Sequence, residues 1–267
     1  KIATKSKHIP IITSIGLNPS RYHKLKAATI QFIQAVAKNG GDAILAGGES
    51  AEYSVNVAAQ LRNNLHAEGW PKLETTQGSN YANDIKHRQL QYEALGDILK
   101  KDFNLVKDIS YIEFLLDSLI GDLPVLRTTI QEALSSLVVH LPNLSLESKN
   151  KLKKILIPIL EQDNFSDEGM DAINAVRFAA IKYINAAFPF EDHEARYLNV
   201  LGTSAKNRSD VIEEAQKGLH PYWFNILQSS NTAEFKSTNE LMGVGNKIKF
   251  PRFCDFVNKL VTEVVGA

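Results

Sequence analysis

The amino-acid sequence predicts an all-α protein, more specifically an α-solenoid of HEAT/armadillo-like helical hairpin repeats. Three observations lead to this prediction. Apolar residues recur at helical spacing along much of the chain, strand signals are scarce, and small, aliphatic and charged positions recur together at long intervals. Apolar residues at i, i+3, i+4 and i+7 lie on one face of a helix, and that face must be buried against a neighbour.

The expected helices are short and follow one another closely. The first begins near Pro19–Ser20, with Ser20 as N-cap, and runs to Gly40–Gly41. Later helices are each predicted by one apolar stripe, and the stripes are Ile112/Leu115/Leu116/Leu119, Ile130/Leu134/Leu137/Val138/Leu141, Leu152/Ile155/Leu156/Ile159/Leu160 and Phe253/Val257/Leu260/Val261/Val264.

Capping residues and prolines mark the expected helix ends. Asp108 precedes the first of these stripes, and Pro142 closes the second. Ser145 is expected to cap the third helix, which Pro158 should kink or split, because proline removes a backbone donor. A further helix is expected to start at Ser166 or Asp167 and to end before Pro189.

Repeats become visible when Arg88, Arg127, Arg177 and Ile212 are aligned, at intervals of 39, 50 and 35 residues. These intervals bracket the period of about 40–47 residues that is typical of two-helix HEAT units. Six and seven residues after each aligned position stand the pairs Ala94/Leu95, Ala133/Leu134, Tyr183/Ile184 and Gly218/Leu219. A small residue beside a large aliphatic one lets two helices approach closely.

An acidic residue stands just upstream of three of the aligned positions. In stacked repeats, such an acid and the arginine of a neighbouring unit can form a ladder that fixes the stacking angle. The alternative is a set of unrelated surface ion pairs, each worth roughly 0–1 kcal/mol. The predicted ladder consists of Asp84, Arg88, Asp122, Arg127, Asp171 and Arg177.

We expect one solenoid segment over residues 1–267, as part of a longer protein, because the chain begins with Lys1 and no signal peptide follows. The repeats are clearest over residues 80–220. The polar, glycine-bearing stretch at about 229–249 is expected to be an irregular insertion or loop.

Composition limits the classes of partner. The 30 basic and 30 acidic side chains cancel, which argues against nucleic acid, and no apolar run approaches the ~20 residues that cross a bilayer. Cys254, the single cysteine, allows no disulfide within the chain and favours cytosol or nucleus over the secretory route.

No motif for a cofactor or metal is found. The glycine-rich stretch at 40–49 lacks the order of a P-loop or a dinucleotide-binding loop. The seven histidines are scattered, and residues 163–174 resemble a calcium loop only superficially, with Phe165 at a ligand position. We therefore expect no catalytic residue, cofactor, metal or small-molecule substrate.

A stack of helical hairpins offers a long surface for macromolecular partners, so the first hypothesis is a scaffold or adaptor. The second is an enzyme with a pocket where the repeats break, around Gly41–Gly69 or Ser229–Lys249. A third is a solenoid with another cargo, such as a nuclear transport receptor or a phosphatase scaffold. Tyr222–Phe224 could anchor a partner, and the lysines at 149, 151, 153 and 154 could dock an acidic one.

Four segments carry a specific resemblance. They are HRQLQYEALG (residues 87–96), RTTIQEALS (127–135), ARYL (195–198) and VIEEAQKGL (211–219). In this order they resemble the HEAT-repeat family of proteasome adaptor and scaffold proteins, the extracellular-mutant twenty-nine proteins. The resemblance covers about residues 85–220.

The resemblance implies a non-enzymatic protein of the cytoplasm and nucleus whose partners are subunits of the proteasome core and regulatory particles. It further implies that the protein tethers these two particles and monitors proteasome assembly. No family motif assigns partner contacts to these positions, so the partner-binding residues are left open.

Overall fold

The structure is a computed structural model that describes residues 12, 15–18, 23–39, 49–66, 81–161, 169–188, 196–197, 200 and 207–229. Over these ranges the regular secondary structure is entirely helical and contains no strand, which confirms the predicted all-α class. The chain divides into two compact units, residues 1–152 and 153–267, and each is described by itself.

The first unit contains most of the described helices. They are α2 (His23–Asn39), α4 (Glu49–His66), α5 (Tyr81–Lys101), α6 (Phe103–Val106), α7 (Ser110–Gly121), the 3-10 helix η3 (Pro124–Leu126), α8 (Arg127–Leu137) and the 3-10 helix η4 (Val138–Asn143). Helix α9 (Leu146–Glu161) crosses the boundary between the units. The second unit contains α10 (Met170–Ala187) and α12 (Ser209–Ser229), which pack against each other.

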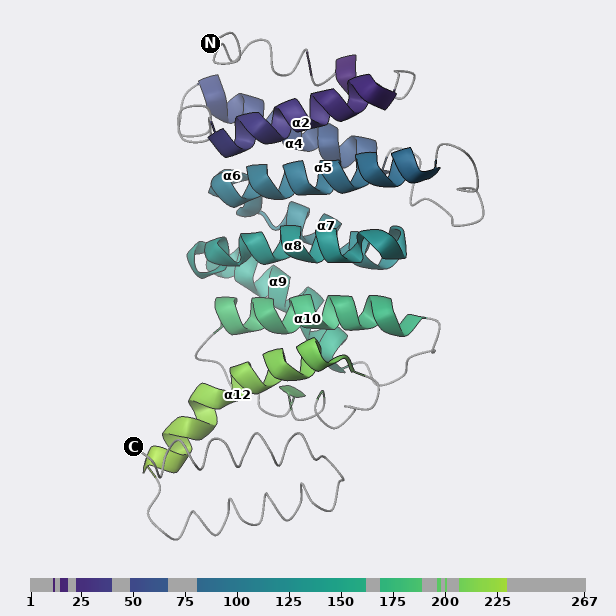
Figure 1. Cartoon of the computed structure of the whole chain (residues 1–267). Helices are drawn as coiled ribbons and strands as arrows, with labels where there is room; N and C mark the ends of the chain where they lie inside the picture. The colour runs from purple at the N-terminus through teal and green to yellow at the C-terminus, as the bar shows by residue number, and fades with distance from the viewer. Residues whose placement is uncertain are drawn as a thin grey trace. The chain divides into compact units, whose positions relative to one another are not determined.

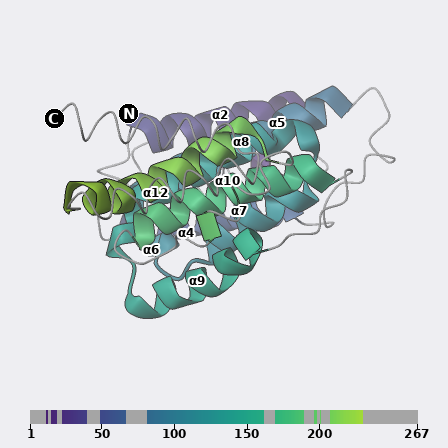
Figure 2. The same cartoon turned by 90° about the horizontal axis from the view of Figure 1, so that it is seen from below.

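Within the first unit, α2, α5 and α8 lie side by side in one layer (Figure 1). Helix α4 packs against α5 and α7 packs against α8, both on the same side of that layer (Figure 2). The apolar stripe of α7 explains this arrangement, because its aliphatic residues Ile112, Leu115 and Leu119 are all 0 % exposed. Burial of each such side chain contributes about 1.5–3 kcal/mol.

Two expected helix starts carry side-chain hydrogen bonds to backbone N–H groups, from the N-cap Ser145 of α9 and from Asp108, the residue before the N-cap Ile109 of α7. The Ser145 hydroxyl accepts a hydrogen bond from the backbone N–H of Ser148 at 3.1 Å, which confirms Ser145 as the cap of α9. The Asp108 carboxylate accepts one from the N–H of Ser110, the first residue of α7, at 3.1 Å. Helix α2 is described from His23, and Ser20 lies outside the described residues.

Both prolines lie inside helices, Pro158 in α9 and Pro142 in η4, and the kink expected at Pro158 stays a prediction. Pro158 does not split α9, which continues to Glu161. Because Pro158 is exposed, water can satisfy the carbonyl group that the missing N–H leaves free. Pro142 does not close an α-helix directly, since α8 ends at Leu137 and Pro142 lies inside η4.

Helices α5 and α8 approach each other at Gly96. A Cβ atom added to Gly96 would lie 3.0 Å from the Cβ of Ala133 and 3.1 Å from its Cα. In the second unit, a Cβ added to Gly218 would lie 2.4 Å from Oδ1 of Asn185. Ala133 and Gly218 are two of the small residues in the repeat alignment, and they lie at close helix contacts.

Ile109 holds a left-handed backbone conformation, with φ 64° and ψ −3°, in the turn between α6 and α7. Its N–H donates to the carbonyl of Val106 at 2.9 Å, and its carbonyl accepts from the N–H of Glu113 at 3.0 Å. The conformation costs a residue with a side chain about 1–2 kcal/mol. Burial of the Ile109 side chain, which is 1 % exposed, offsets that cost.

Several expected features lie outside the described residues. These are the possible caps Ser166 and Asp167, the greater part of the polar stretch 229–249, and the helix expected at Phe253–Val264. No helix in the described ranges is long and apolar enough to cross a membrane.

The left-handed backbone at Ile109 predicts that glycine and alanine substitutions there rank in stability opposite to their order inside a helix. Ile109→Gly should be at least as stable as Ile109→Ala, because glycine relieves about 1 kcal/mol of backbone strain that alanine retains. At Ile112, inside α7, Ile112→Gly should be about 1 kcal/mol less stable than Ile112→Ala. Urea unfolding of the four variants measures both differences, and the same order at both positions would contradict the strained turn.

Candidate functional site

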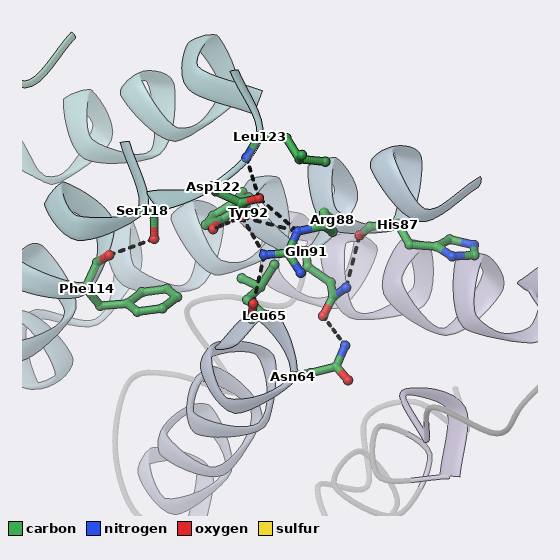
Figure 3. Close-up of polar contacts among 10 residues, drawn as sticks. All are labelled: Asn64, Leu65, His87, Arg88, Gln91, Tyr92, Phe114, Ser118, Asp122 and Leu123. Carbon is green, nitrogen blue, oxygen red and sulfur yellow. Dashed lines mark hydrogen bonds and ion pairs between the residues drawn. The ribbon is translucent and has the colours of Figure 1, made fainter. Parts of the chain in front are cut away.

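Asp122 is the central residue of a buried polar junction in the first unit (Figure 3). It is the C-cap of α7, its N–H donates to the carbonyl of Ser118 at 3.0 Å, and its side chain is 0 % exposed. A carboxylate at a helix C-terminus faces the negative end of the helix dipole. Because Asp122 is also buried, its charge requires close compensation.

Arg88 of α5 supplies that compensation. Its Nε lies 3.1 Å from Oδ1 and 3.2 Å from Oδ2 of Asp122, and its Nη2 lies 2.5 Å from Oδ2. Two further donors reach the carboxylate: the Tyr92 hydroxyl at 2.6 Å and the N–H of Leu123 at 2.7 Å. Both carboxylate oxygens are therefore satisfied, one of the conditions under which a buried ion pair is tolerated.

Arg88 also binds a third helix. Its Nη2 donates to the carbonyl of Leu65 in the last turn of α4, at 2.8 Å. The last carbonyls of a helix have no partner within the helix and form the negative end of its dipole. One guanidinium on α5 thus neutralises the C-terminal ends of both α4 and α7.

Side-chain amides extend the junction along α4 and α5. The amide of Asn64 donates to Oε1 of Gln91 at 2.6 Å, and the amide of Gln91 donates to the carbonyl of His87 at 3.2 Å. Gln91 is buried, so these bonds satisfy polar groups that water cannot reach easily.

Aromatic side chains enclose the other side of the junction. The rings of Tyr92 and Phe114 are stacked, with centroids 6.5 Å apart, and the guanidinium carbon of Arg62 lies 5.4 Å from the ring centroids of Tyr111 and Phe114. Burial raises the pKa of Tyr92 well above its ordinary value, and the negative charge of Asp122 raises it further.

The six residues of the predicted ladder have different environments. Asp84 lies exposed in the first turn of α5, Arg88 binds Asp122, and Nε of Arg127 donates to the carbonyl of Leu119 at 3.2 Å. The Arg88–Asp122 pair joins the arginine of one aligned segment to the acid that precedes the next. A ladder that repeats along the chain stays a prediction.

The second unit holds the last two ladder residues. Asp171 pairs with Arg208 at 3.1 Å, and Arg208 also pairs with Asp210 at 2.9 Å. Arg177 is buried and donates to Oδ1 of Asn207 at 2.8 Å.

The sequence alone did not indicate several residues of these networks, chiefly Tyr92, Gln91, Asn64 and Arg208. A signal existed for Tyr92, which stands four residues after Arg88 and so lies on the same face of α5. No comparable signal pointed to the Leu65 carbonyl, because a backbone group leaves no trace in the sequence.

The junction is structural rather than reactive in its chemistry, since its charges are paired and buried. The described residues include no group of three or more His, Cys, Asp or Glu side chains that could hold a metal ion. Two regions were considered for an enzyme pocket. Helix α4 occupies part of the first, Gly41–Gly69, and the second, after Ser229, lies outside the described residues. The side chains of Tyr222–Phe224 also lie outside them.

Three of the four lysines of α9 have partners among the described residues. Lys149 donates to the carbonyl of Pro142 at 2.9 Å, Lys151 pairs with Glu147 at 2.7 Å, and the ammonium of Lys153 lies 5.4 Å from the ring centroid of Phe188. Docking of an acidic partner on this helix stays a hypothesis.

The chain matches a known family. The family model described as proteasome component ECM29, N-terminal, matches residues 1–202 of the chain. No solved structure was found to match.

Three relatives are similar in sequence. The proteasome component ECM29 of Saccharomyces cerevisiae is 45 % identical over 271 aligned residues, which cover 98 % of this chain and 14 % of that protein. The proteasome component ecm29 of Schizosaccharomyces pombe is 30 % identical over 61 % of this chain and 9 % of its own length. The human proteasome adapter and scaffold protein ECM29 is 28 % identical over 61 % of this chain and 8 % of its own length. The chain therefore spans less than a sixth of each relative.

The buried ion pair predicts strong energetic coupling between Arg88 and Asp122. Arg88→Met or Asp122→Leu alone should each lower the free energy of unfolding by about 3 kcal/mol, because each leaves a partner charge buried without compensation. The double variant should lose about 2 kcal/mol less than the sum of the two. Urea unfolding followed by circular dichroism measures all three.

The matched control is the exposed pair Asp171 and Arg208, whose side chains are 57 % and 35 % exposed. Its coupling, from Asp171→Leu, Arg208→Met and the double variant, should be roughly 0–1 kcal/mol. Equal coupling energies for the two pairs would contradict the claim that the buried Arg88–Asp122 pair stabilises the fold more than a surface ion pair does.

The raised pKa of Tyr92 predicts a pH-dependent effect of Tyr92→Phe. Folded chains keep Tyr92 protonated above pH 10, where unfolded chains release the proton, so Tyr92 destabilises the fold progressively as pH rises. Tyr92→Phe should cost about 1.5 kcal/mol at pH 7 through the lost hydrogen bond, and the cost should shrink by about 1.4 kcal/mol per pH unit above pH 10. Urea unfolding at pH 7, 10 and 11 tests this. The cost of Phe114→Leu should not change with pH, and a parallel change in both variants would refute the assignment.

Proposed function

The chain belongs to the family described as proteasome component ECM29, N-terminal, and on that premise we propose that it is part of a proteasome-binding adaptor and scaffold protein. The observation that carries the proposal is the match over residues 1–202, together with 45 % identity to the S. cerevisiae relative over 98 % of the chain. The all-α fold is compatible with it.

We further propose that the helices belong to an α-solenoid of HEAT-like hairpins that continues beyond this segment. The layer of α2, α5 and α8 supports the proposal, because neighbouring helices of the layer pack on each other, and α5 and α8 each pack on a helix behind, α4 and α7 respectively. A solenoid of this kind offers an extended binding surface and no deep pocket. On this account the protein acts as a scaffold and not as an enzyme, in the cytoplasm and the nucleus.

The proposed mechanism is mechanical and multivalent. Separate parts of a long solenoid bind the core particle and the regulatory particle, and tethering raises the effective concentration of one particle near the other. The same geometry would let the protein monitor assembly, since a faulty complex presents the two binding surfaces at the wrong distance. Rigid junctions such as Arg88–Asp122 would set that distance by fixing the angles between helices.

Capture of proteasomes by the immobilised chain tests the proposal. At low and at physiological salt the chain should retain purified proteasomes, and from a cell extract it should recover proteasome subunits above the level of the bare resin. Core and regulatory particles assayed separately show which of them this segment contacts. Recovery of transport factors or phosphatase subunits, with no proteasome subunits, would overturn the proposal in favour of a different cargo.

A further inference from the structure

A cleft of about 270 Å³ lies between α2, α5 and α8 in the first unit. The residues of α8 that line it are spaced at i, i+3, i+4 and i+7, and those of α5 at i, i+3 and i+4, so the cleft follows one face of each helix. The lining residues used below are Gln34, Glu93, Gly96, Thr129, Glu132 and Ala133.

The cleft is acidic. Glu93 and Glu132 both line it, and the carboxylate of Glu93 accepts hydrogen bonds from the amides of Gln34 at 3.2 Å and Gln89 at 3.1 Å. These donors are neutral, so they orient the carboxylate of Glu93 without cancelling its charge. Glu132 is exposed, and within the described ranges no cation pairs with it or with Glu93.

Part of the lining consists of two small residues, Gly96 and Ala133. They meet where α5 and α8 approach closely, since a Cβ atom added to Gly96 would lie 3.0 Å from the Cβ of Ala133. A methylene chain fits such a surface, as the stems of lysine and arginine do elsewhere.

Thr129 supplies an independent observation. Thr129 lines the cleft, the residue as a whole is 8 % exposed, and no partner for its hydroxyl occurs among the described residues. Its oxygen is not among the buried side-chain atoms that lack a partner, so it reaches solvent and is open to a ligand. An open acceptor beside two carboxylates suits a ligand that carries several N–H donors.

We propose that this cleft binds a lysine or arginine side chain from a basic segment of a protein partner. The methylene stem lies over Gly96 and Ala133, the cationic head lies between Glu93 and Glu132, and Thr129 accepts one of its N–H groups. The two carboxylates repel a phosphate-bearing partner. The inference rests on the proposed function only for the identity of the partner, a subunit of the proteasome.

Fluorescence anisotropy with a labelled peptide of alternating lysine and alanine tests the cleft directly, without proteasomes. Glu93→Gln combined with Glu132→Gln should weaken binding of the peptide about tenfold or more. The matched control, Glu113→Gln combined with Glu213→Gln, removes the same charge from exposed residues of α7 and α12 and should leave binding unchanged. A peptide with glutamine in place of lysine should bind neither the parent chain nor the variants.

Equal weakening in both double variants would mean non-specific attraction and would overturn the proposal, as would the absence of peptide binding to the parent chain. Capture of proteasomes by the same variants separates the two claims. Loss of capture with Glu93→Gln/Glu132→Gln alone supports the cleft as a proteasome contact. Peptide binding that depends on the cleft, without any capture of proteasomes by the parent chain, keeps the cleft and contradicts the proposed function.

Discussion

The buried ion pair between Arg88 and Asp122 is the interaction on which the described arrangement of the first unit most depends. A carboxylate at the C-terminus of α7 would be unfavourable both through burial and through the helix dipole. Arg88 offsets these penalties with its positive charge and at the same time binds the free carbonyl of Leu65 at the end of α4. A single side chain of α5 thus fixes the ends of two helices that are distant in sequence.

Sequence periodicity predicted which segments are helical. Apolar residues spaced as in α7 lie on one face, and so can be buried together, only if the segment is a helix. It also identified Ser145 as a cap, because capping depends on residues three positions apart. Long-range partners were harder to predict from the sequence. Arg88 could be named as a residue that fixes helix stacking, but its contact with the Leu65 carbonyl depends on how α4 folds back on α5. The left-handed turn at Ile109 gave no signal, because a β-branched residue is an unfavourable choice there and tertiary packing outweighs the preference.

The junction and the acidic cleft share α5. Arg88 and Tyr92 bind the helices behind the layer, whereas Glu93 and Gly96 face α2 and α8. A helix held rigidly on one side can present carboxylates at a fixed separation on another, which lowers the entropic cost of binding a partner. In the proposed scaffold, two large particles are bound at a set distance from each other. The rigidity of the helices would then matter for function as much as the residues that contact the particles.

Hydrogen exchange of the backbone amides, followed by mass spectrometry, tests most directly whether Arg88 holds the helices together. In an Arg88→Met variant, exchange in the last turns of α4 and α7 should accelerate together, while α12 in the second unit keeps its protection. Acceleration confined to α5, with α4 and α7 unchanged, would contradict the account, because the guanidinium would then be a local surface contact and not the link between three helices.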